Sequence, residues 1–84
     1  MDDPNDNNVA SLYRQAFHLS ELAVKEDNKG NKELARNSYL EVIRIFETIL
    51  RLETEKKQKN LVWAKGQEYY IRVQQLDAEL KTNL

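Results

Sequence analysis

Few side chains in this 84-residue sequence are of the types that perform acid–base, nucleophilic or metal chemistry. The chain has one histidine, His18, and no cysteine, so a metal site built from several nitrogen or sulfur ligands is not expected. A serine nucleophile needs a base partner, and none stands at a recognisable spacing from Ser11, Ser20 or Ser38. Two glycines are too few for a phosphate-binding loop. We therefore expect neither catalysis nor a cofactor.

The charged residues are balanced along the chain rather than concentrated. There are 13 Lys and Arg against 14 Asp and Glu, whereas nucleic-acid-binding proteins usually carry a basic excess or stripe. The carboxylates alternate with Lys and Arg, which indicates solvated ion pairs rather than acid–base dyads. No apolar run approaches the roughly 20 residues that span a bilayer, and the acidic N-terminus is unlike a secretory signal. We expect a cytoplasmic protein with no nucleic-acid partner and no direct membrane insertion.

The spacing of apolar residues predicts three helices, over about 9–28, 32–54 and 61–81. Residues 1–8 are expected to form a disordered lead, so that residues 9–82 make one all-α domain. Gly30 stands where the first helix needs a left-handed C-terminal residue. An asparagine precedes each predicted helix as a candidate N-cap: Asn8, Asn31 and Asn60.

The second predicted helix has the broadest apolar surface, covering about half of its circumference. A helix of this kind packs against two neighbours, and the connections are short. The sequence therefore predicts an antiparallel up-down-up three-helix bundle with the second helix in the centre. The first helix carries a core stripe from Val9 to Ala23 and a flanking stripe of Tyr13, Phe17 and Val24, which Ser20 interrupts. The core stripe of the third helix is Val62, Tyr69, Val73, Leu76 and Leu80.

Two aromatic residues of the third helix, Trp63 and Tyr70, are seven positions apart and lie beside its core stripe. Gly66 and Asp77 fall on the same flank. The rings either line a groove with a neighbouring helix, where they would anchor a partner, or extend the core. Gly66 likewise indicates either close helix contact or room for a partner.

Four segments match a known family in order and with nearly constant spacing. The first segment lies in the first predicted helix, and the second covers the turn and the start of the second helix. The third lies in the second half of the second helix, and the fourth lies in the third helix. They comprise Ala16, Leu19 and Ala23 before Lys25-Glu26-Asp27; the turn 28–31 before Glu33, Ala35 and Tyr39; Ile43, Phe46, Ile49, Leu50 and Glu53; and Ala64-Lys65 before Tyr69-Tyr70-Ile71-Arg72 and Leu76. From about Leu12 to Leu80 the chain resembles the MIT domain, the microtubule-interacting and trafficking module. It is most similar to the copy at the N-terminus of the AAA ATPase that disassembles ESCRT-III filaments and of its archaeal cell-division relatives.

The resemblance implies two peptide-binding grooves on a three-helix bundle. The groove between helices two and three would take an amphipathic helix, and the groove between helices one and three an extended, proline-containing peptide. Tyr70 stands in place of a family leucine and Ser20 in place of an aliphatic residue, which would reshape both grooves. The candidate peptide-binding residues are Trp63, Lys65, Gly66, Tyr70 and Asp77 on the third helix and Leu40, Ile43 and Glu47 on the second.

We therefore expect a non-catalytic adaptor domain that docks short C-terminal motifs of ESCRT-III-like filament subunits. It would recruit an attached activity, such as an AAA ATPase, to endosomal or division-site membranes, and it is expected to be monomeric in isolation. One alternative is a solitary tetratricopeptide-like hairpin, which shares the spacing of Gly30, Ala35 and Tyr39. Another is a structural bundle or dimerisation module that buries part of the third helix between subunits, namely Trp63, Ala64, Tyr70, Ile71 and Ala78.

Overall fold

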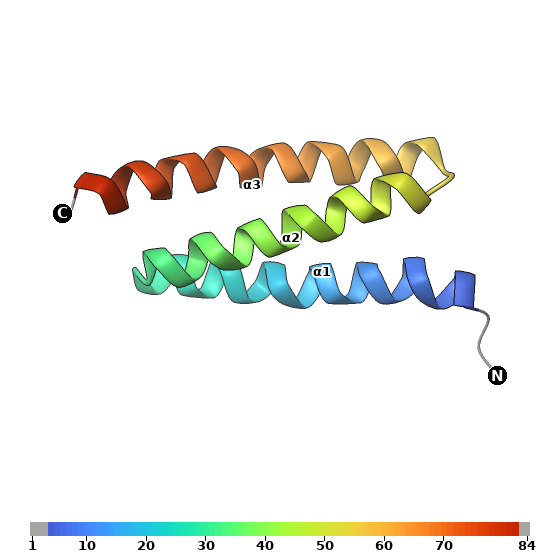
Figure 1. Ribbon diagram of the computed structural model, residues 1–84, viewed down its shortest axis with the longest axis horizontal. Helices are drawn as coiled ribbons and strands as arrows, with labels where there is room; N and C mark the ends of the chain where they lie inside the picture. The colour runs from blue at the N-terminus through green and yellow to red at the C-terminus, as the bar shows by residue number, and fades with distance from the viewer. Residues whose placement is uncertain (1–3, 83–84) are drawn as a thin grey trace.

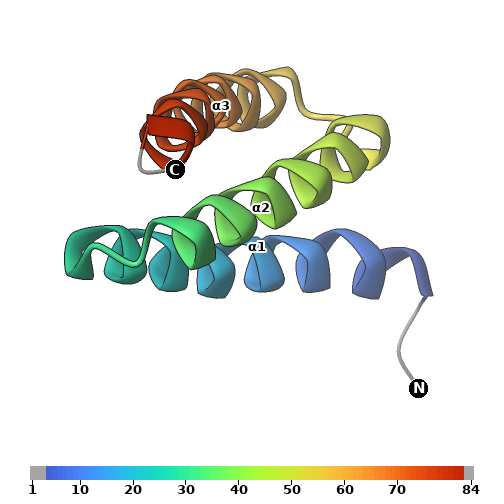
Figure 2. The same ribbon diagram turned by 60° about the vertical axis from the view of Figure 1, so that its left-hand side comes forward.

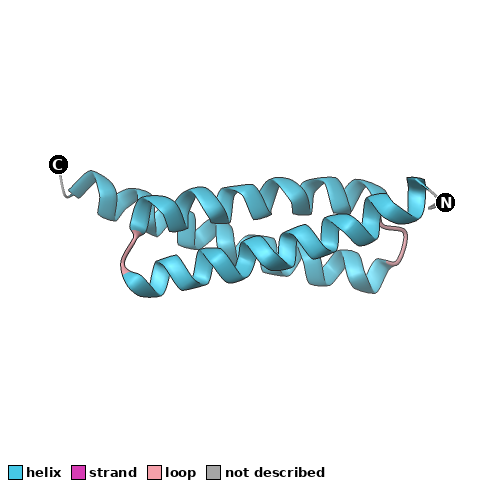
Figure 3. Ribbon diagram, turned by 90° about the horizontal axis from the view of Figure 1, so that it is seen from below, coloured by secondary structure: helices cyan, strands magenta, loops and turns pink. Residues whose placement is uncertain are grey.

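The structure is a computed structural model that describes residues 4–82. It consists of α1 (Pro4–Lys29), α2 (Lys32–Leu52) and α3 (Lys56–Thr82), which alternate in direction and lie lengthwise in one bundle (Figures 1 and 3). Within residues 4–82 no strand is present. The prediction of an all-α, antiparallel three-helix bundle is confirmed.

Two helices begin earlier than predicted. α1 begins at Pro4 rather than Val9, so the expected disorder is wrong for residues 4–8; residues 1–3 lie outside the described residues. Proline suits the first position of a helix because its ring fixes a helical φ and its missing N–H is not needed there. α3 begins at Lys56 rather than Leu61, because the charged run of residues 56–60 consists mostly of good helix formers without Gly or Pro. α2 ends at Leu52, two residues before the predicted end, because Glu53 is extended.

The predicted asparagine caps are not formed. Asn8 and Asn60 lie inside α1 and α3, and the Asn31 side chain makes no hydrogen bond to the first turn of α2. Asn31 Nδ2 instead donates to the Glu26 carboxylate at the end of α1. Gly30 has a φ of 85°, as predicted. The Gly30 and Asn31 amides donate to the carbonyls of Asp27 and Glu26, which satisfies backbone acceptors at the C-terminus of α1.

α2 lies in the centre and supplies much of the core, as its broad apolar surface predicted. Two clusters of buried side chains follow one another along it, and Val42 and Ile49 are fully buried. Small residues of α1 let the two helices of the first hairpin approach closely. The cluster nearer the α2–α3 connection contains Ala16, Val42, Ile45, Ile49 and Val62, and the cluster nearer the first hairpin turn contains Ala23, Ala35, Tyr39, Val73 and Leu76.

α1 and α3 lie farther from each other than either lies from α2. α2 runs obliquely between them, and no Cα atom of α1 lies within 8 Å of one in α3 over the described helices (Figures 1 and 2). Each outer helix packs mainly against α2, although both core clusters contain residues of α1 and of α3. This arrangement produces two grooves, one on each side of α3.

Candidate functional site

The smaller groove lies between α2 and α3 and has a volume of about 390 Å³. We call it the α2/α3 groove. Its walls are mainly apolar and aromatic, and Glu47 is the one charged residue that lines it within the described chain. The lining residues are Ile43, Phe46, Glu47, Leu50, Val62, Trp63, Gly66, Gln67 and Tyr70.

Five of the eight predicted site residues meet in this groove. They are Ile43, Glu47, Trp63, Gly66 and Tyr70. Trp63 and Tyr70 are 60% and 50% exposed, so the alternative that both rings extend the core is wrong. A Cβ atom on Gly66 would meet Phe46 Cδ2 at 3.4 Å, an ordinary van der Waals contact. Helix packing therefore does not require glycine here, and Gly66 leaves room in the groove.

The other three predicted residues lie elsewhere. Lys65 is five positions before Tyr70, about 140° around the helix, which places it on the opposite side of α3. Its Nζ atom lies 5.6 Å from the centroid of the Tyr69 ring. Leu40 is half-buried against the core cluster near the first hairpin turn. Asp77 lies on the flank of Tyr70 but outside the groove lining, where its carboxylate accepts a hydrogen bond from Arg36 Nε.

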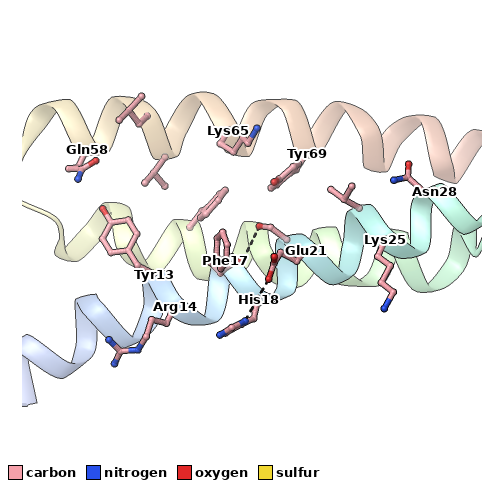
Figure 4. A pocket seen from close by; sticks show the side chains of 16 residues that line it. Tyr13, Arg14, Phe17, His18, Glu21, Lys25, Asn28, Gln58, Lys65 and Tyr69 are labelled. Carbon is pink, nitrogen blue, oxygen red and sulfur yellow. Dashed lines mark hydrogen bonds and ion pairs between the residues drawn. The ribbon is translucent and has the colours of Figure 1, made fainter.

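The larger groove lies between α1 and α3, has a volume of about 1040 Å³, and is called the α1/α3 groove (Figure 4). Tyr13 and Phe17 point from α1 toward α3, and Tyr69 lies on the facing wall. Phe46 of α2 contributes to its floor and stacks on Tyr69, with ring centroids 6.1 Å apart. The apolar lining comprises Tyr13, Ala16, Phe17, Val24, Phe46, Leu61, Val62 and Tyr69.

Ser20, which the family resemblance placed in this groove, lines it, and the sequence carried one further signal. The flanking stripe of Tyr13, Phe17 and Val24 is present in the sequence and lines the groove. A stripe beside a core stripe is equally compatible with burial against another helix. Only the distance between α1 and α3 shows that Phe17, 62% exposed, has no helix covering it.

A set of polar contacts links α1 and α3 near the first hairpin turn. Asp27 accepts hydrogen bonds from Arg72 Nε at 2.8 Å and Nη2 at 2.7 Å, and from the Tyr39 hydroxyl at 3.0 Å. The Arg72 hydrogen bonds are the main reason that the pKa of Asp27 is lowered. Burial, followed by the contact with Asp27, raises the pKa of Tyr39 to about 12. These contacts connect the C-terminal end of α1 to α2 and to the interior of α3.

A second polar contact lies at the opposite end of the bundle. The Tyr13 hydroxyl donates to Glu53 Oε1 at 2.7 Å, which ties α1 to the connection between α2 and α3. Burial and then the Glu53 contact raise the pKa of Tyr13 to about 12, and the same hydrogen bond lowers the pKa of Glu53. The Tyr13 and Asp27 contacts therefore lie near opposite ends of the α1 wall of the α1/α3 groove.

Neither groove is arranged for metal or acid–base chemistry. In residues 4–82 no group of three or more His, Cys, Asp or Glu side chains is placed to hold a metal ion. His18 is exposed, and its Nδ1 atom lies 3.9 Å from Glu21 Oε1. The same residues include no helix long and apolar enough to cross a membrane. Both grooves instead present mainly apolar surface.

Comparison with known proteins identifies one family. The model of the MIT (microtubule interacting and transport) domain matches residues 13–78, a range that contains every residue lining either groove. Neither the curated proteins nor the solved structures yield a match.

Proposed function

This chain belongs to the MIT domain family, a family of non-catalytic protein-interaction domains, and we propose that it docks short C-terminal motifs of ESCRT-III-like filament subunits in its α2/α3 groove. The observation that carries the proposal is the pair Trp63 and Tyr70. Both rings are at least half exposed beside an apolar wall of α2. Large, partly exposed aromatic residues are frequent anchors of protein interfaces.

The groove suits the apolar face of a short helix. Trp63 and Tyr70 are seven residues apart on α3, which is about 10 Å along the helix axis and about two turns of a partner helix. Such a partner would present apolar side chains at i, i+3, i+4 and i+7 spacing. Because such a short helix buries little surface area on binding, we expect a dissociation constant roughly in the micromolar range.

Two residues of the groove determine what the motif must present. Glu47 is the one charged lining residue among those described, so a Lys or Arg beside the apolar face of the motif would be favoured. The Tyr70 side chain is larger than the leucine of the family pattern, and its ring ends in a polar hydroxyl group. The motif side chain that faces Tyr70 should therefore be smaller than in motifs that bind the leucine form.

Docking of this kind would act by recruitment. The domain would bring an attached activity, most plausibly an AAA ATPase, to filaments that remodel endosomal or division-site membranes. Membrane association would then be peripheral and would pass through the filament subunit, with the domain itself remaining cytoplasmic. The domain functions in this scheme as a monomer.

The test is a nuclear magnetic resonance titration of the ¹⁵N-labelled domain with C-terminal peptides of ESCRT-III-like subunits. We expect the Trp63 indole and Tyr70 amide signals to shift, and Tyr70→Asp to weaken binding at least about tenfold. Ile71→Asp is the matched control, because Ile71 is the next residue, is 54% exposed and lines neither groove. Both variants should keep the helical circular dichroism signal.

Two results would contradict the proposal. One is the absence of any shift at about 1 mM peptide, and the other is equal affinity of the Tyr70→Asp variant and the wild-type protein. Sedimentation velocity is run in parallel. A tight dimer that shields Trp63 would favour the dimerisation module instead.

A further inference from the structure

We propose that Gly66 is the specificity-determining residue of the α2/α3 groove, and that it selects partner helices with one aromatic anchor side chain. The anchor ring would lie on the Gly66 backbone, between Trp63 and Tyr70. This inference rests on the proposed function, because it concerns the same groove. It adds which side chain the motif must present and where along the motif that side chain must stand, a requirement that an amphipathic helix as such does not meet.

Gly66 lies between two exposed rings on the groove side of α3. Trp63 stands three residues before it and Tyr70 four residues after it, a spacing that places all three on one face of the helix. Trp63 and Tyr70 are 60% and 50% exposed and line the groove, whereas Gly66 has no side chain to fill the space between them. The two rings therefore form the sides of a subsite whose floor is the Gly66 backbone.

The space above Gly66 is open except on the side of α2. A Cβ atom built on Gly66 would lie 3.4 Å from Phe46 Cδ2, and within the described residues neither the Trp63 nor the Tyr70 side chain comes within 4 Å of it. The half-buried Phe46 ring stacks on Tyr69, with ring centroids 6.1 Å apart and an interplanar angle of 12°. A ring that rests on Gly66 would therefore contact the edge of a supported Phe46 ring as well as the two side rings.

The spacing of the two side rings favours an aromatic anchor over an aliphatic one. Seven residues of α3 correspond to about 10 Å along the helix axis. A ring midway between Trp63 and Tyr70 would lie about 5 Å from each along this axis, within the range of roughly 4.5–7 Å at which aromatic rings pair favourably. A leucine in the same place gains neither aromatic contact. We therefore expect a motif with Phe at this position to bind about tenfold more tightly than one with Leu.

Gly66 and Tyr70 have opposite effects on the size of the motif side chains. Tyr70 fills space, so the motif residue that faces it must be small, whereas Gly66 opens space one helical turn closer to the N-terminus of α3. The two positions are four residues apart, about 6 Å along the helix axis. A partner helix that lies along α3 should therefore carry its aromatic residue and its small residue three or four positions apart.

The probes are pairs of synthetic, end-blocked helical peptides of about 15 residues that differ at one position. Each peptide has a Leu stripe, Lys on its flanks to face Glu47, and Ala four residues from the variable position, which holds Phe in one member and Leu in the other. The variable position and its Ala are moved along the stripe, in both orders, so that every register is sampled. Trp63 is the one tryptophan of the chain, so its fluorescence follows each titration. We expect a preference for Phe of about tenfold in the best register, with nuclear Overhauser contacts from the peptide ring to the Gly66 Hα protons.

Substitution of Gly66 tests the subsite while the helices stay folded, because an added Cβ meets Phe46 at an ordinary distance. Gly66→Ala should lower the preference for Phe to about threefold, and Gly66→Leu should remove it. Ala64→Leu is the matched control, because Ala64 is exposed on α3 and lines neither groove, and it should keep the full preference. Tyr70→Leu should reduce the preference as well, because it removes one of the two aromatic contacts. The ratio of the two affinities is the readout, since a general loss of structure would weaken both peptides alike.

Failure of this inference is distinct from failure of the proposed function. If the Leu peptides bind and shift the Trp63 and Tyr70 signals but Phe gives no gain in any register, the Gly66 subsite is wrong although the groove docks helices. If no synthetic peptide binds at about 1 mM, the inference is overturned, and the titration with ESCRT-III-like peptides decides separately on the proposed function. A preference for Phe that Gly66→Leu leaves unchanged, or Overhauser contacts of the peptide ring with Phe17 or Leu61, would also overturn it. So would a dimer of the free protein, measured by sedimentation equilibrium, that Gly66→Leu dissociates, because a second copy would then occupy the subsite.

Discussion

Replacing Asp27 by Asn removes the charge from the contact between α1 and α3 with almost no change of shape. The Asp27 side chain is only 14% exposed and accepts two hydrogen bonds from Arg72 and one from Tyr39. The asparagine oxygen can keep one of these partners. The variant therefore loses the charge-assisted pairing of Arg72, and a hydrogen bond to a charged group contributes about 1.5–3 kcal/mol.

Arg72 limits this loss because it has other neighbours. Its Nη1 atom lies 3.6 Å from Glu79 Oε2 and 3.0 Å from Gln75 Oε1, so the guanidinium does not become fully unpaired. We expect the free energy of unfolding to fall by about 2 kcal/mol, a large part of the roughly 3–5 kcal/mol available to a domain of this size. The melting temperature should fall by about 8–16 °C.

Urea denaturation followed by circular dichroism measures this difference, and its pH dependence identifies the cause. The pKa of Asp27 is lower in the folded protein, mainly because of the Arg72 hydrogen bonds. The stabilisation is therefore fully present above the unfolded-state pKa of about 3.9 and is lost as pH falls through the lower folded-state pKa. The wild-type protein and the variant should become more similar in stability as the pH falls through this range.

Asp77→Asn is the matched control, because Asp77 also joins two helices through an arginine. Its side chain is 39% exposed and pairs with Arg36, so this substitution should cost less than about 1 kcal/mol. If Asp27→Asn lowers the free energy of unfolding no more than Asp77→Asn does, the inference that the contact between α1 and α3 contributes more to stability is wrong. A difference that persists unchanged in acid would show that charge is not the cause.

Three further predictions concern packing and ionisation. Gly66→Ala should raise the free energy of unfolding by about 1 kcal/mol in urea denaturation, because alanine favours the helix and its Cβ meets Phe46 at an ordinary 3.4 Å; a decrease would contradict this. Ile49→Ala should lower the free energy of unfolding by about 2–5 kcal/mol, because Ile49 is fully buried. Circular dichroism should then show a largely unfolded chain on mild heating. A variant that stays folded would show that the core collapses around the cavity. Ultraviolet absorbance titration should detect tyrosines that ionise near pH 12, and Tyr13→Phe and Tyr39→Phe should each remove one of them.

The helices and their arrangement were largely predictable because burial imposes a local period on the sequence. Val62, Val73 and Leu76 were expected in the core and are buried there, and the broad apolar surface of α2 correctly placed it in the centre. The start of α3 was missed because a run of charged residues indicates exposure to solvent. An exposed segment is not necessarily a loop, and residues 56–60 form the exposed start of α3.

The candidate site was only partly predictable because it depends on distances between helices. Trp63 and Tyr70 share a face of one helix at seven-residue spacing, so the sequence alone placed them together. Lys65 was assigned to the same groove from the family pattern, although five-residue spacing directs it to the other side of α3. The α1/α3 groove exists because α1 and α3 stand apart, and no periodicity within either helix shows that separation.

The division between buried and exposed aromatic residues separates stability from binding in this domain. Tyr39 is buried and hydrogen-bonded, whereas Phe17, Trp63 and Tyr70 remain at least half exposed in the folded chain. A ring of this kind contributes less to the free energy of folding than a buried one, because at least half of its surface stays in contact with water. Aspartate at Phe17 or Tyr70 should therefore disturb the groove without unfolding the helices. A loss of binding in these variants, with the fold preserved, would then report on the docking surface itself.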